Sequence, residues 1–276
     1  MSARLAALRA LLVLVAIVPS WMPTMADAAD PILLHAAGSL RGALNEIAAA
    51  YEKSSGIRVT AKYGASGLLR DEIARGEKAE VFASANMEHP QALAKAGKSG
   101  PVVLFARNQL CALVRPGLTV APASLLDRML ASDVKLGTST PKADPSGDYA
   151  WEVFRKADAQ RPGAYAKLTK KALQLTGGPP GETPSSDRNL YGTLVAQGRA
   201  DIFLTYCTNA LVAVRENPGE RMVALPEPLA VGADYGLTVM VTASPAAYRF
   251  AMFILSPDAQ RILANHGFTA PGLLLR

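Results

Sequence analysis

Short apolar runs alternate with amphipathic stretches along most of the chain, and this alternation limits the possible folds more than any single motif. Residues 32–37 form an apolar run, and the apolar residues of 40–51 then recur at helical spacing. Residues 57–63 alternate between apolar and polar as a strand does, and Gly64-Ala-Ser-Gly67 opens a second helix before the apolar run 81–84. The order strand, helix, strand, helix, strand predicts an open parallel sheet covered on both faces.

The same alternation returns after a longer extended stretch at 102–114, which is long enough to carry the chain from one lobe to another. A helix is expected at 164–173, and the Gly/Pro-rich stretch 176–184 predicts a loop. We therefore predict an α/β protein of two lobes, each an open mixed sheet flanked by helices, with crossing strands near 105–110 and 208–235. The expected division is a leader at 1–28, a first lobe at 29–106 and 213–276, and a second lobe at 107–212.

The first 28 residues have the pattern of a secretory leader. Arg4 and Arg9 come first, residues 10–18 are uniformly apolar, and Ala26-Asp-Ala28 matches the A-x-A pattern cut by signal peptidase. The apolar run is shorter than the ~20 residues that a membrane-spanning helix requires. We expect a cleavable signal peptide and a periplasmic protein.

Charge and composition exclude several classes of protein. Half of the residues are hydrophobic, which is typical of a folded globular chain. Without the leader the chain keeps 27 basic and 22 acidic residues, a formal net charge of +5. The lysines and arginines are scattered and no run reaches five, so a solvated surface is favoured over a nucleic-acid partner.

The chain has two cysteines, Cys111 and Cys207. In an exported protein two cysteines more often pair than bind metal, and these two lack the CxxC spacing of zinc and redox sites. We predict a disulfide between them. The alternative is that both are small buried apolar side chains.

Motifs for catalysis are incomplete. A hydrolase elbow around Ser66 would require glycine at position 68, where the chain has Leu68. The possible bases of a triad are His35, His89 and His266, and none has a suggestive sequence context. No dinucleotide-binding, Walker A or HExxH motif occurs, so we expect no cofactor and no resident metal. A secreted serine hydrolase remains an alternative, but a protein without enzymatic activity is favoured.

Polar, mostly uncharged groups stand where four helices are expected to begin. They are Ser39, Ser66, the turn 144–149 and the stretch 187–190. Each alone is explained by ordinary helix capping. Together they suggest an anion site, because helix N-termini carry unpaired N–H donors and meet at the carboxyl edge of an open α/β sheet.

Several segments resemble the periplasmic molybdate-binding components of ABC importers. Between 32 and 85 they are "HAAGSL", "YGASGLLRDEI" and "EVFASAN"; later ones are the DPxG-Y turn at 144–149, "ADIFLTYCTNA" and "SPDAQRILANHGF". The resemblance implies a type II periplasmic binding protein that captures molybdate or tungstate between its lobes and delivers it to an inner-membrane ABC permease. We expect this receptor to act as a monomer.

The resemblance also implies a set of ligand-binding residues. Two hydroxyls, a backbone donor and a phenol fall on Ser39, Ser66, Ser146 and Tyr206. A further backbone donor falls on either Arg188 or Leu190.

Two residues depart from that pattern, and they leave the choice of ligand open. Asp144 either caps its helix or, as in some tungstate- and molybdate-binding relatives, reaches the metal of the oxyanion. Arg188 would favour a different anion if it bound the ligand. Ferric iron is an alternative ligand, because iron sites use paired phenolates and the second half of the chain offers Tyr149, Tyr191, Tyr206 and Tyr235.

Overall fold

The computed structural model describes residues 30–178 and 188–273. The expected leader and residue 187 of the expected donor stretch lie outside them. The first strands and helices alternate as the sequence predicts up to residue 84, after which the helix at 88–95 is an addition. They are β1 (Ile32–Ala37), α1 (Arg41–Ser55), β2 (Val59–Gly64), α2 (Ser66–Ala74), β3 (Val81–Ser84), α3 (Glu88–Lys95) and the long strand β4 (Val103–Val114).

The second half continues the alternation and then returns to the first. Its elements are α4 (Leu125–Leu130), β5 (Leu136–Ser139), α5 (Pro145–Gln160), α6 (Ala164–Lys171), β6 (Leu173–Thr176), α7 (Leu190–Ala196), β7 (Ile202–Tyr206), α8 (Cys207–Glu216), β8 (Arg221–Ala224), β9 (Gly232–Val239), α9 (Pro245–Ile254) and α10 (Pro257–Asn265). No helix in the described part of the chain has the length and apolar character needed to cross a bilayer.

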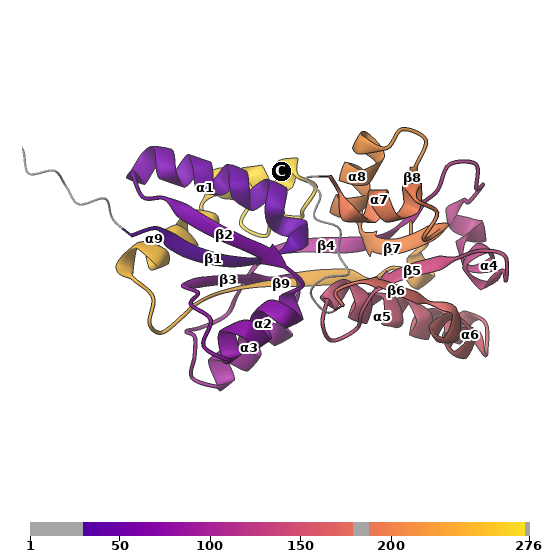
Figure 1. The fold of residues 1–276 in the computed structure, drawn as a ribbon, viewed down its shortest axis with the longest axis horizontal. Coiled ribbons are helices and arrows are strands. Elements are labelled where there is room, and N and C mark those ends of the chain that lie inside the picture. The colour runs from indigo at the N-terminus through magenta and orange to yellow at the C-terminus, as the bar shows by residue number, and fades with distance from the viewer. Residues whose placement is uncertain (1–29, 179–187, 274–276) are drawn as a thin grey trace, which may run out of the picture.

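The strands follow the order β2-β1-β3-β9-β4-β7-β5-β6, with β8 also paired to β4. In the first lobe β1 is parallel to β2 and β3, and in the second β5 is parallel to β6 and β7. Figure 1 shows α1 on one face of the first lobe's strands and α2 and α3 on the other. The second lobe is arranged in the same way, with α7 and α8 on one face and α5 and α6 on the other. The predicted two-lobed α/β fold is confirmed.

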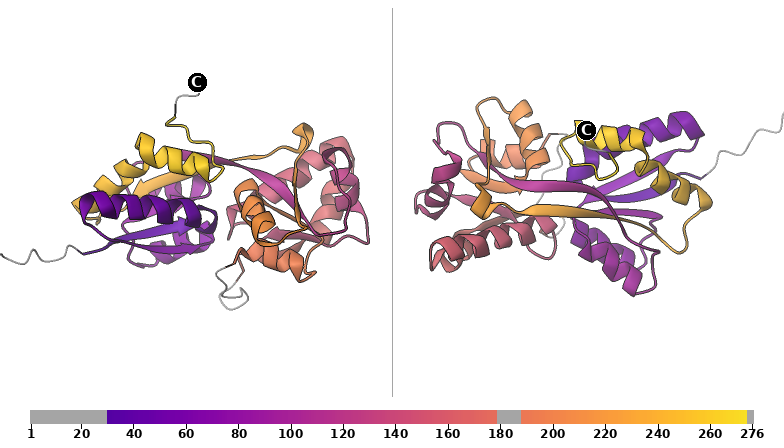
Figure 2. Two further views of the ribbon diagram at one scale, coloured as in Figure 1. Left: turned by 90° about the horizontal axis from the view of Figure 1, so that it is seen from above. Right: turned by 180° about the vertical axis from the view of Figure 1, so that it is seen from behind.

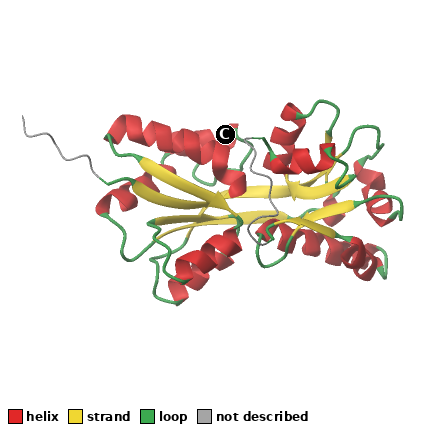
Figure 3. Ribbon diagram, viewed as in Figure 1, coloured by secondary structure: helices red, strands yellow, loops and turns green. Residues whose placement is uncertain are grey.

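Strand β4 belongs to both lobes. Residues 103–109 pair with β9, whereas 110–114 pair with β7 and β8. Its second part is buried throughout, as a strand covered on both faces must be. Figure 2 shows, from two further directions, that β4 and the neighbouring β9 run between the lobes. Figure 3 shows the same strands in yellow among the red helices of both lobes.

The chain returns to the first lobe later than the expected boundary at 213. Residues 207–216 are a helix, α8, instead of part of a crossing strand, because Ala210 and Ala213 form a face that packs on Leu113 and Phe203. Strand β8 then pairs with residues 111–114 of β4. The second lobe thus continues to about residue 225. The helix expected at 164–173 ends at Lys171, and Leu173 begins strand β6.

Serine-proline pairs start the two C-terminal helices. Ser244 accepts a hydrogen bond from the N–H of Ala247, and Ser256 accepts one from Ala259. A proline occupies the first helical position after each serine, where no N–H is needed. These caps position α10 beside α1 in the first lobe.

The predicted disulfide between Cys111 and Cys207 is present. It joins β4 to the first residue of α8, immediately after Tyr206, and closes a loop of 96 residues. The bond therefore fixes the junction of β7 and α8 to the strand that connects the lobes.

Reduction of this disulfide should lower the free energy of unfolding by about 2 to 4 kcal/mol, because the unfolded chain regains the freedom of a long loop. Urea unfolding with and without dithiothreitol measures the change. A Cys111→Ala/Cys207→Ala variant is the control, and dithiothreitol should not change its unfolding midpoint. Equal midpoints for the oxidised and reduced wild type would contradict the prediction.

Candidate functional site between the lobes

The carboxyl ends of the parallel strands in both lobes face the same interlobe space. Ser66 follows β2, and Asp144 follows β5. The N–H of Gly67 donates to the carbonyl of Ala143 at 2.8 Å, so the backbones of the two lobes are in direct contact beside both residues. This contact brings the helix starts of α2 and α5 together.

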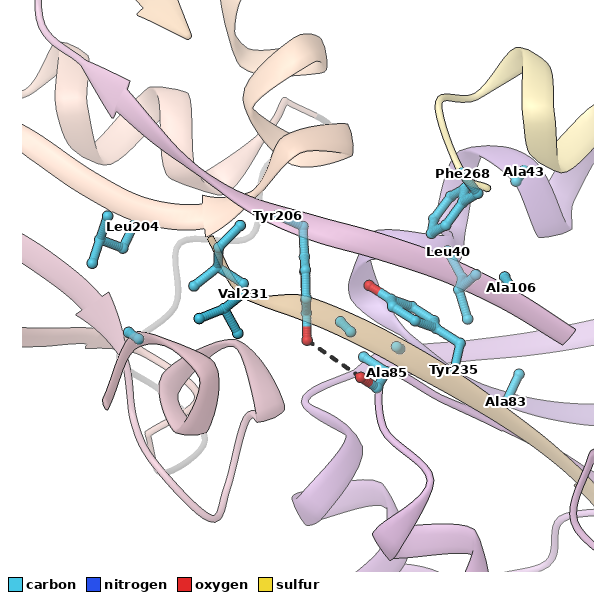
Figure 4. Close-up of a cluster of buried hydrophobic side chains, with 14 of the residues drawn as sticks. Leu40, Ala43, Ala83, Ala85, Ala106, Leu204, Tyr206, Val231, Tyr235 and Phe268 are labelled. Atoms are coloured by element: carbon cyan, nitrogen blue, oxygen red, sulfur yellow. Dashed lines mark hydrogen bonds between the residues drawn. The ribbon is translucent and has the colours of Figure 1, made fainter. Parts of the chain in front are cut away.

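Ser66 lies at one end of a set of hydrogen bonds that crosses between the lobes through Ala85. Its hydroxyl is buried and accepts from the N–H of Ala85 at 3.1 Å. The carbonyl of Ala85 in turn accepts long bonds of 3.5 Å from the phenols of Tyr206 and Tyr149. Figure 4 shows Tyr206 pointing from the end of β7 toward Ala85. Ser66 does not cap α2, whose N-cap is Ala65.

Ser39 belongs to a second group on the β4 side of the site. It lies in a 3-10 turn ahead of α1 and caps no helix. Its hydroxyl is 2.9 Å from the phenol oxygen of Tyr235. The side-chain amide of Asn108 donates to that same oxygen at 3.3 Å and to the hydroxyl of Thr208 at 2.9 Å. Asn108 and Thr208 were not predicted, although the polar break at 107–109 in an apolar strand was a signal for Asn108.

Asp144 and Ser146 occupy the start of α5. Asp144 is the N-cap and accepts from the N–H of Ser146 at 3.0 Å, so its capping role is present. The Ser146 hydroxyl is fully buried, and no partner for it occurs in residues 30–178 and 188–273. A free buried hydroxyl at a helix start is suited to donate to a bound group.

Burial raises the pKa of Asp144 to about 6, an effect that its hydrogen bonds from Ser146 and Ser139 offset only in part. The negative charge of Asp148 raises it further. Within the described ranges no lysine or arginine forms an ion pair with Asp144. The carboxyl is therefore buried without a compensating cation.

Four tyrosines have buried phenols in this part of the molecule, and the charge of Asp144 acts on three of them, Tyr191, Tyr206 and Tyr235. Burial raises the pKa of each phenol above its ordinary value. This holds for Tyr149, Tyr191, Tyr206 and Tyr235. The phenols are neutral at ordinary pH and can act as hydrogen-bond donors. Their rings also pack on one another, with 5.6 Å between the centroids of Tyr206 and Tyr235.

Of the two candidates at the α7 start, Arg188 is directed toward the end of α8. Its guanidinium donates to the carbonyl of Glu216 at 2.8 Å and to the side chain of Asn217 at 2.7 Å. Leu190 is the first residue of α7, which Asn189 caps through the N–H of Gly192. The choice between Arg188 and Leu190 as a donor stays a prediction.

The glycine at 67 is required by the contact between the lobes. A Cβ atom there would lie 2.2 Å from the carbonyl oxygen of Lys142 and 2.6 Å from that of Ala143. Lys142 adopts a left-handed backbone with φ of 69°, and its N–H donates to the Asp148 carboxylate at 2.9 Å. The Gly-Ala-Ser-Gly motif thus supplies the Ser66 hydroxyl of the candidate site and, at Gly67, the room that the two lobes need to approach each other.

Two hollows open along the seam between the lobes beside this contact. One of about 350 Å³ is lined by Arg70, Glu88, His89, Ala92, Lys142 and Asp148. The other, of about 240 Å³, reaches Tyr149 and Pro145 of α5 and Asn86 in the first lobe. Both hollows have walls from the two lobes.

Two lobes that meet at the carboxyl ends of their strands, with buried hydroxyls supplied by both, define a two-lobed binding protein for a small solute. The model of the bacterial extracellular solute-binding protein family matches residues 32–269. The chain belongs to this family.

Individual relatives cover most of the chain. An uncharacterized protein of Pasteurella multocida, PM1146, is 34% identical over 203 residues, which are 73% of this chain and 84% of the relative. The molybdate-binding protein ModA of Escherichia coli is 25% identical over 247 residues, with 86% of this chain and 88% of ModA covered.

Solved structures share the fold. The periplasmic molybdate-binding protein of Azotobacter vinelandii superposes with a TM-score of 0.70 at 20% identity, covering 89% of this chain and all of that one. The sulfate-binding protein SubI of Mycobacterium tuberculosis gives 0.72 at 20% identity and 88% coverage of both chains. Iron-bound HitA of Pseudomonas aeruginosa gives 0.63 at 16% identity, with 90% and 89% covered.

An Asp144→Asn variant should be more stable than the wild type at pH 7.5 without ligand. Because the folded pKa lies above the unfolded value of 3.8, the wild type loses stability as pH rises from about 4 to 6. Asparagine still caps the helix but cannot ionise, so the variant avoids this loss of unfolding free energy. For a pKa raised by two units the loss is at most about 3 kcal/mol.

Urea unfolding at pH 4 and pH 7.5 measures the difference between variant and wild type. The free energy of unfolding of Asp144→Asn should exceed that of the wild type at pH 7.5, and the two should be nearly equal at pH 4. Asp30→Asn, an exposed carboxyl near the start of β1, is the matched control. An equal gain at both pH values would show that the charge of Asp144 is not its cause.

Proposed function

We propose that this protein captures molybdate, or the similar tungstate, between its lobes and presents it to an ABC permease in the inner membrane. It acts in the periplasm as a monomer, after removal of its leader, and it binds without chemical turnover. The observation that carries the proposal is that Ser66 of one lobe and Tyr206 of the other both hydrogen-bond to the backbone of Ala85, where the lobes meet. We propose that Ser39 and the buried hydroxyl of Ser146 complete this set of neutral donors.

Neutral donors suit a dianion that must be both bound and released. Hydroxyl and amide hydrogens stabilise the oxygens of the anion, and the starts of α2 and α5 add the positive ends of their dipoles. Closure of the lobes removes water from the anion and strengthens each of these bonds. Size then separates molybdate from sulfate, which has the same charge and shorter bonds.

The relatives support this ligand class. The named ligand of ModA from Escherichia coli and of the Azotobacter vinelandii protein is molybdate. The sulfate-binding SubI shares the fold as well, so the same fold is found in receptors for more than one tetrahedral oxyanion.

Ferric iron is the second candidate, favoured by the gathering of four phenols and by the similarity to iron-bound HitA. Without a metal, burial raises the pKa of all four tyrosines, so their phenols are neutral and can donate to an oxyanion. The neutral phenols and serine hydroxyls favour an oxyanion.

Hydrolysis by Ser66 receives no support from its contacts. Its oxygen accepts from the backbone of Ala85, and no histidine ring hydrogen-bonds to it in the described part of the chain. His266 instead contacts Glu46 on α1.

A thermal-shift panel tests the ligand directly. Molybdate and tungstate should raise the melting temperature, because a ligand that binds only the folded state stabilises it. Sulfate, phosphate and ferric citrate serve as comparisons and should have smaller effects. A rise with ferric citrate alone would establish the iron receptor in place of the oxyanion receptor.

Replacing either site serine should weaken molybdate binding. We expect Ser39→Ala and Ser66→Ala each to lose about 1 to 3 kcal/mol of binding free energy, because a charged oxygen is left short of a donor. Isothermal titration calorimetry gives the affinities, with Ser54→Ala at the far end of α1 as the control. Unchanged affinity in the Ser39→Ala/Ser66→Ala double variant would overturn the site.

A methyl group at position 67 should also weaken molybdate binding, by at least about tenfold, because it collides with the carbonyls of residues 142 and 143 in the closed form. Gly100→Ala is a matched control, since a Cβ there meets only an ordinary contact at 3.7 Å. Small-angle scattering with saturating molybdate should show that Gly67→Ala stays more extended than Gly100→Ala. Equal compactness and affinity would show that the contact is not needed for closure.

A further inference from the structure

The proposed anion site contains a buried acid, which is unexpected where a negative ligand is to bind. Asp144 is 9% exposed and stands at the start of α5, next to the interlobe contact of Ala143 with Gly67. One carboxylate oxygen accepts from the N–H of Ser146. The Ser139 hydroxyl, which is 2.7 Å from the hydroxyl of Thr176, also lowers the pKa of the carboxyl.

The groups around Asp144 do not offset its charge. The phenols of Tyr191 on α7, Tyr206 on β7 and Tyr235 on β9 are close enough for the charge of Asp144 to raise their pKa, and burial keeps all three neutral. Across the seam, α2 presents Ser66 and the backbone of Gly67.

Charged groups lie farther out. Asp148, one turn along α5, accepts from the N–H of Lys142, and Arg70 lines the outer hollow with both of them. In the described ranges Arg70 forms an ion pair with Asp71, and neither it nor Lys142 pairs with Asp144. The carboxyl therefore has no cation to balance it when a dianion enters.

We propose that Asp144 is a specificity residue that carries a proton in the ligand-bound form and donates its O–H to the oxyanion, so that capture of a fully deprotonated anion takes up one proton. This inference rests on the proposed function and goes beyond it. The reason is electrostatic: an ionised carboxylate and a dianion in one water-excluded space repel each other, whereas a carboxylic acid adds a donor to the site. No covalent bond changes, and the proton comes from water or buffer.

The proposal makes binding depend on pH. Burial already raises the pKa of Asp144 to about 6 in the free protein, and a bound anion would raise it further. At a pH between the pKa of the free protein and that of the complex, the Asp144 carboxyl is ionised in the free form and protonated in the bound form. The affinity for molybdate should then fall about tenfold for each pH unit above about 6.5.

Isothermal titration calorimetry with molybdate from pH 6 to 8.5 tests this dependence. Asp144→Asn keeps the helix cap and replaces the O–H by an amide donor, so its affinity should be nearly constant and exceed that of the wild type at pH 8. Circular dichroism and thermal unfolding verify that the variant is folded.

Glu220→Gln is the matched control. Burial raises the pKa of Glu220 to about 7, so this group titrates in the same range, but it lies in the turn between α8 and β8 and belongs to no part of the site. This variant should follow the pH dependence of the wild type. A slope that disappears in Glu220→Gln and persists in Asp144→Asn would overturn the proposal.

A second measurement needs no variant. Titrations of the wild type at pH 7.5 in buffers of different ionisation enthalpy should report the uptake of close to one proton per molybdate. A value near zero, or a pH-independent affinity, would overturn the role of Asp144 while leaving the molybdate receptor intact. Absence of molybdate binding to the wild type at every pH would instead overturn the proposed function, and with it this inference.

Discussion

The backbone contact between Gly67 and the turn at 142–143 is the constraint on which the closed arrangement depends. Ser66 stands next to one side of this contact and Asp144 next to the other, so a single hydrogen bond between main chains aligns donors from both lobes. Only a residue without a Cβ allows this approach. The left-handed turn at Lys142, held by Asp148, shapes the opposing surface.

Strand β4, which belongs to both lobes, connects the two sides of this contact. Its first part completes the sheet of one lobe and its second part the sheet of the other, and the disulfide from Cys111 attaches α8 to it. Tyr206 is the last residue of β7 and precedes the disulfide-bonded Cys207, and Asn108 lies on β4 itself. The residues that reach across the seam are thus attached to the part of the chain that the two lobes have in common.

The alternation of apolar patterns was sufficient to predict the two-lobed plan and most strands and helices of the first lobe, because buried parallel strands and amphipathic helices differ in period. It did not predict α3. It also failed at 207–216, where the buried face of α8 consists of two alanines and two polar residues, and at 173–176, where the strand is four residues long. Patterns that short or that weakly apolar do not distinguish a helix from an extended segment.

The candidate site was predictable where a residue stands at a helix start and unpredictable where tertiary packing creates the contact. Ser66 and Asp144 belong to the first kind. Asn108 and Thr208 belong to the second, because they meet only when β4 passes the start of α8. Ser39 was expected as a cap and instead contacts Tyr235, a residue 196 positions away.

The uncharged character of the donors also has a consequence for how a captured anion would leave. An anion held by hydroxyls and amides has no ion pair to exchange with dissolved salt, so ionic strength has little influence on its departure. Water that enters an opened cleft can replace each donor in turn. The residence time of such a ligand would then equal the lifetime of the closed form, and the permease would control release by separating the lobes at the Gly67–Ala143 contact.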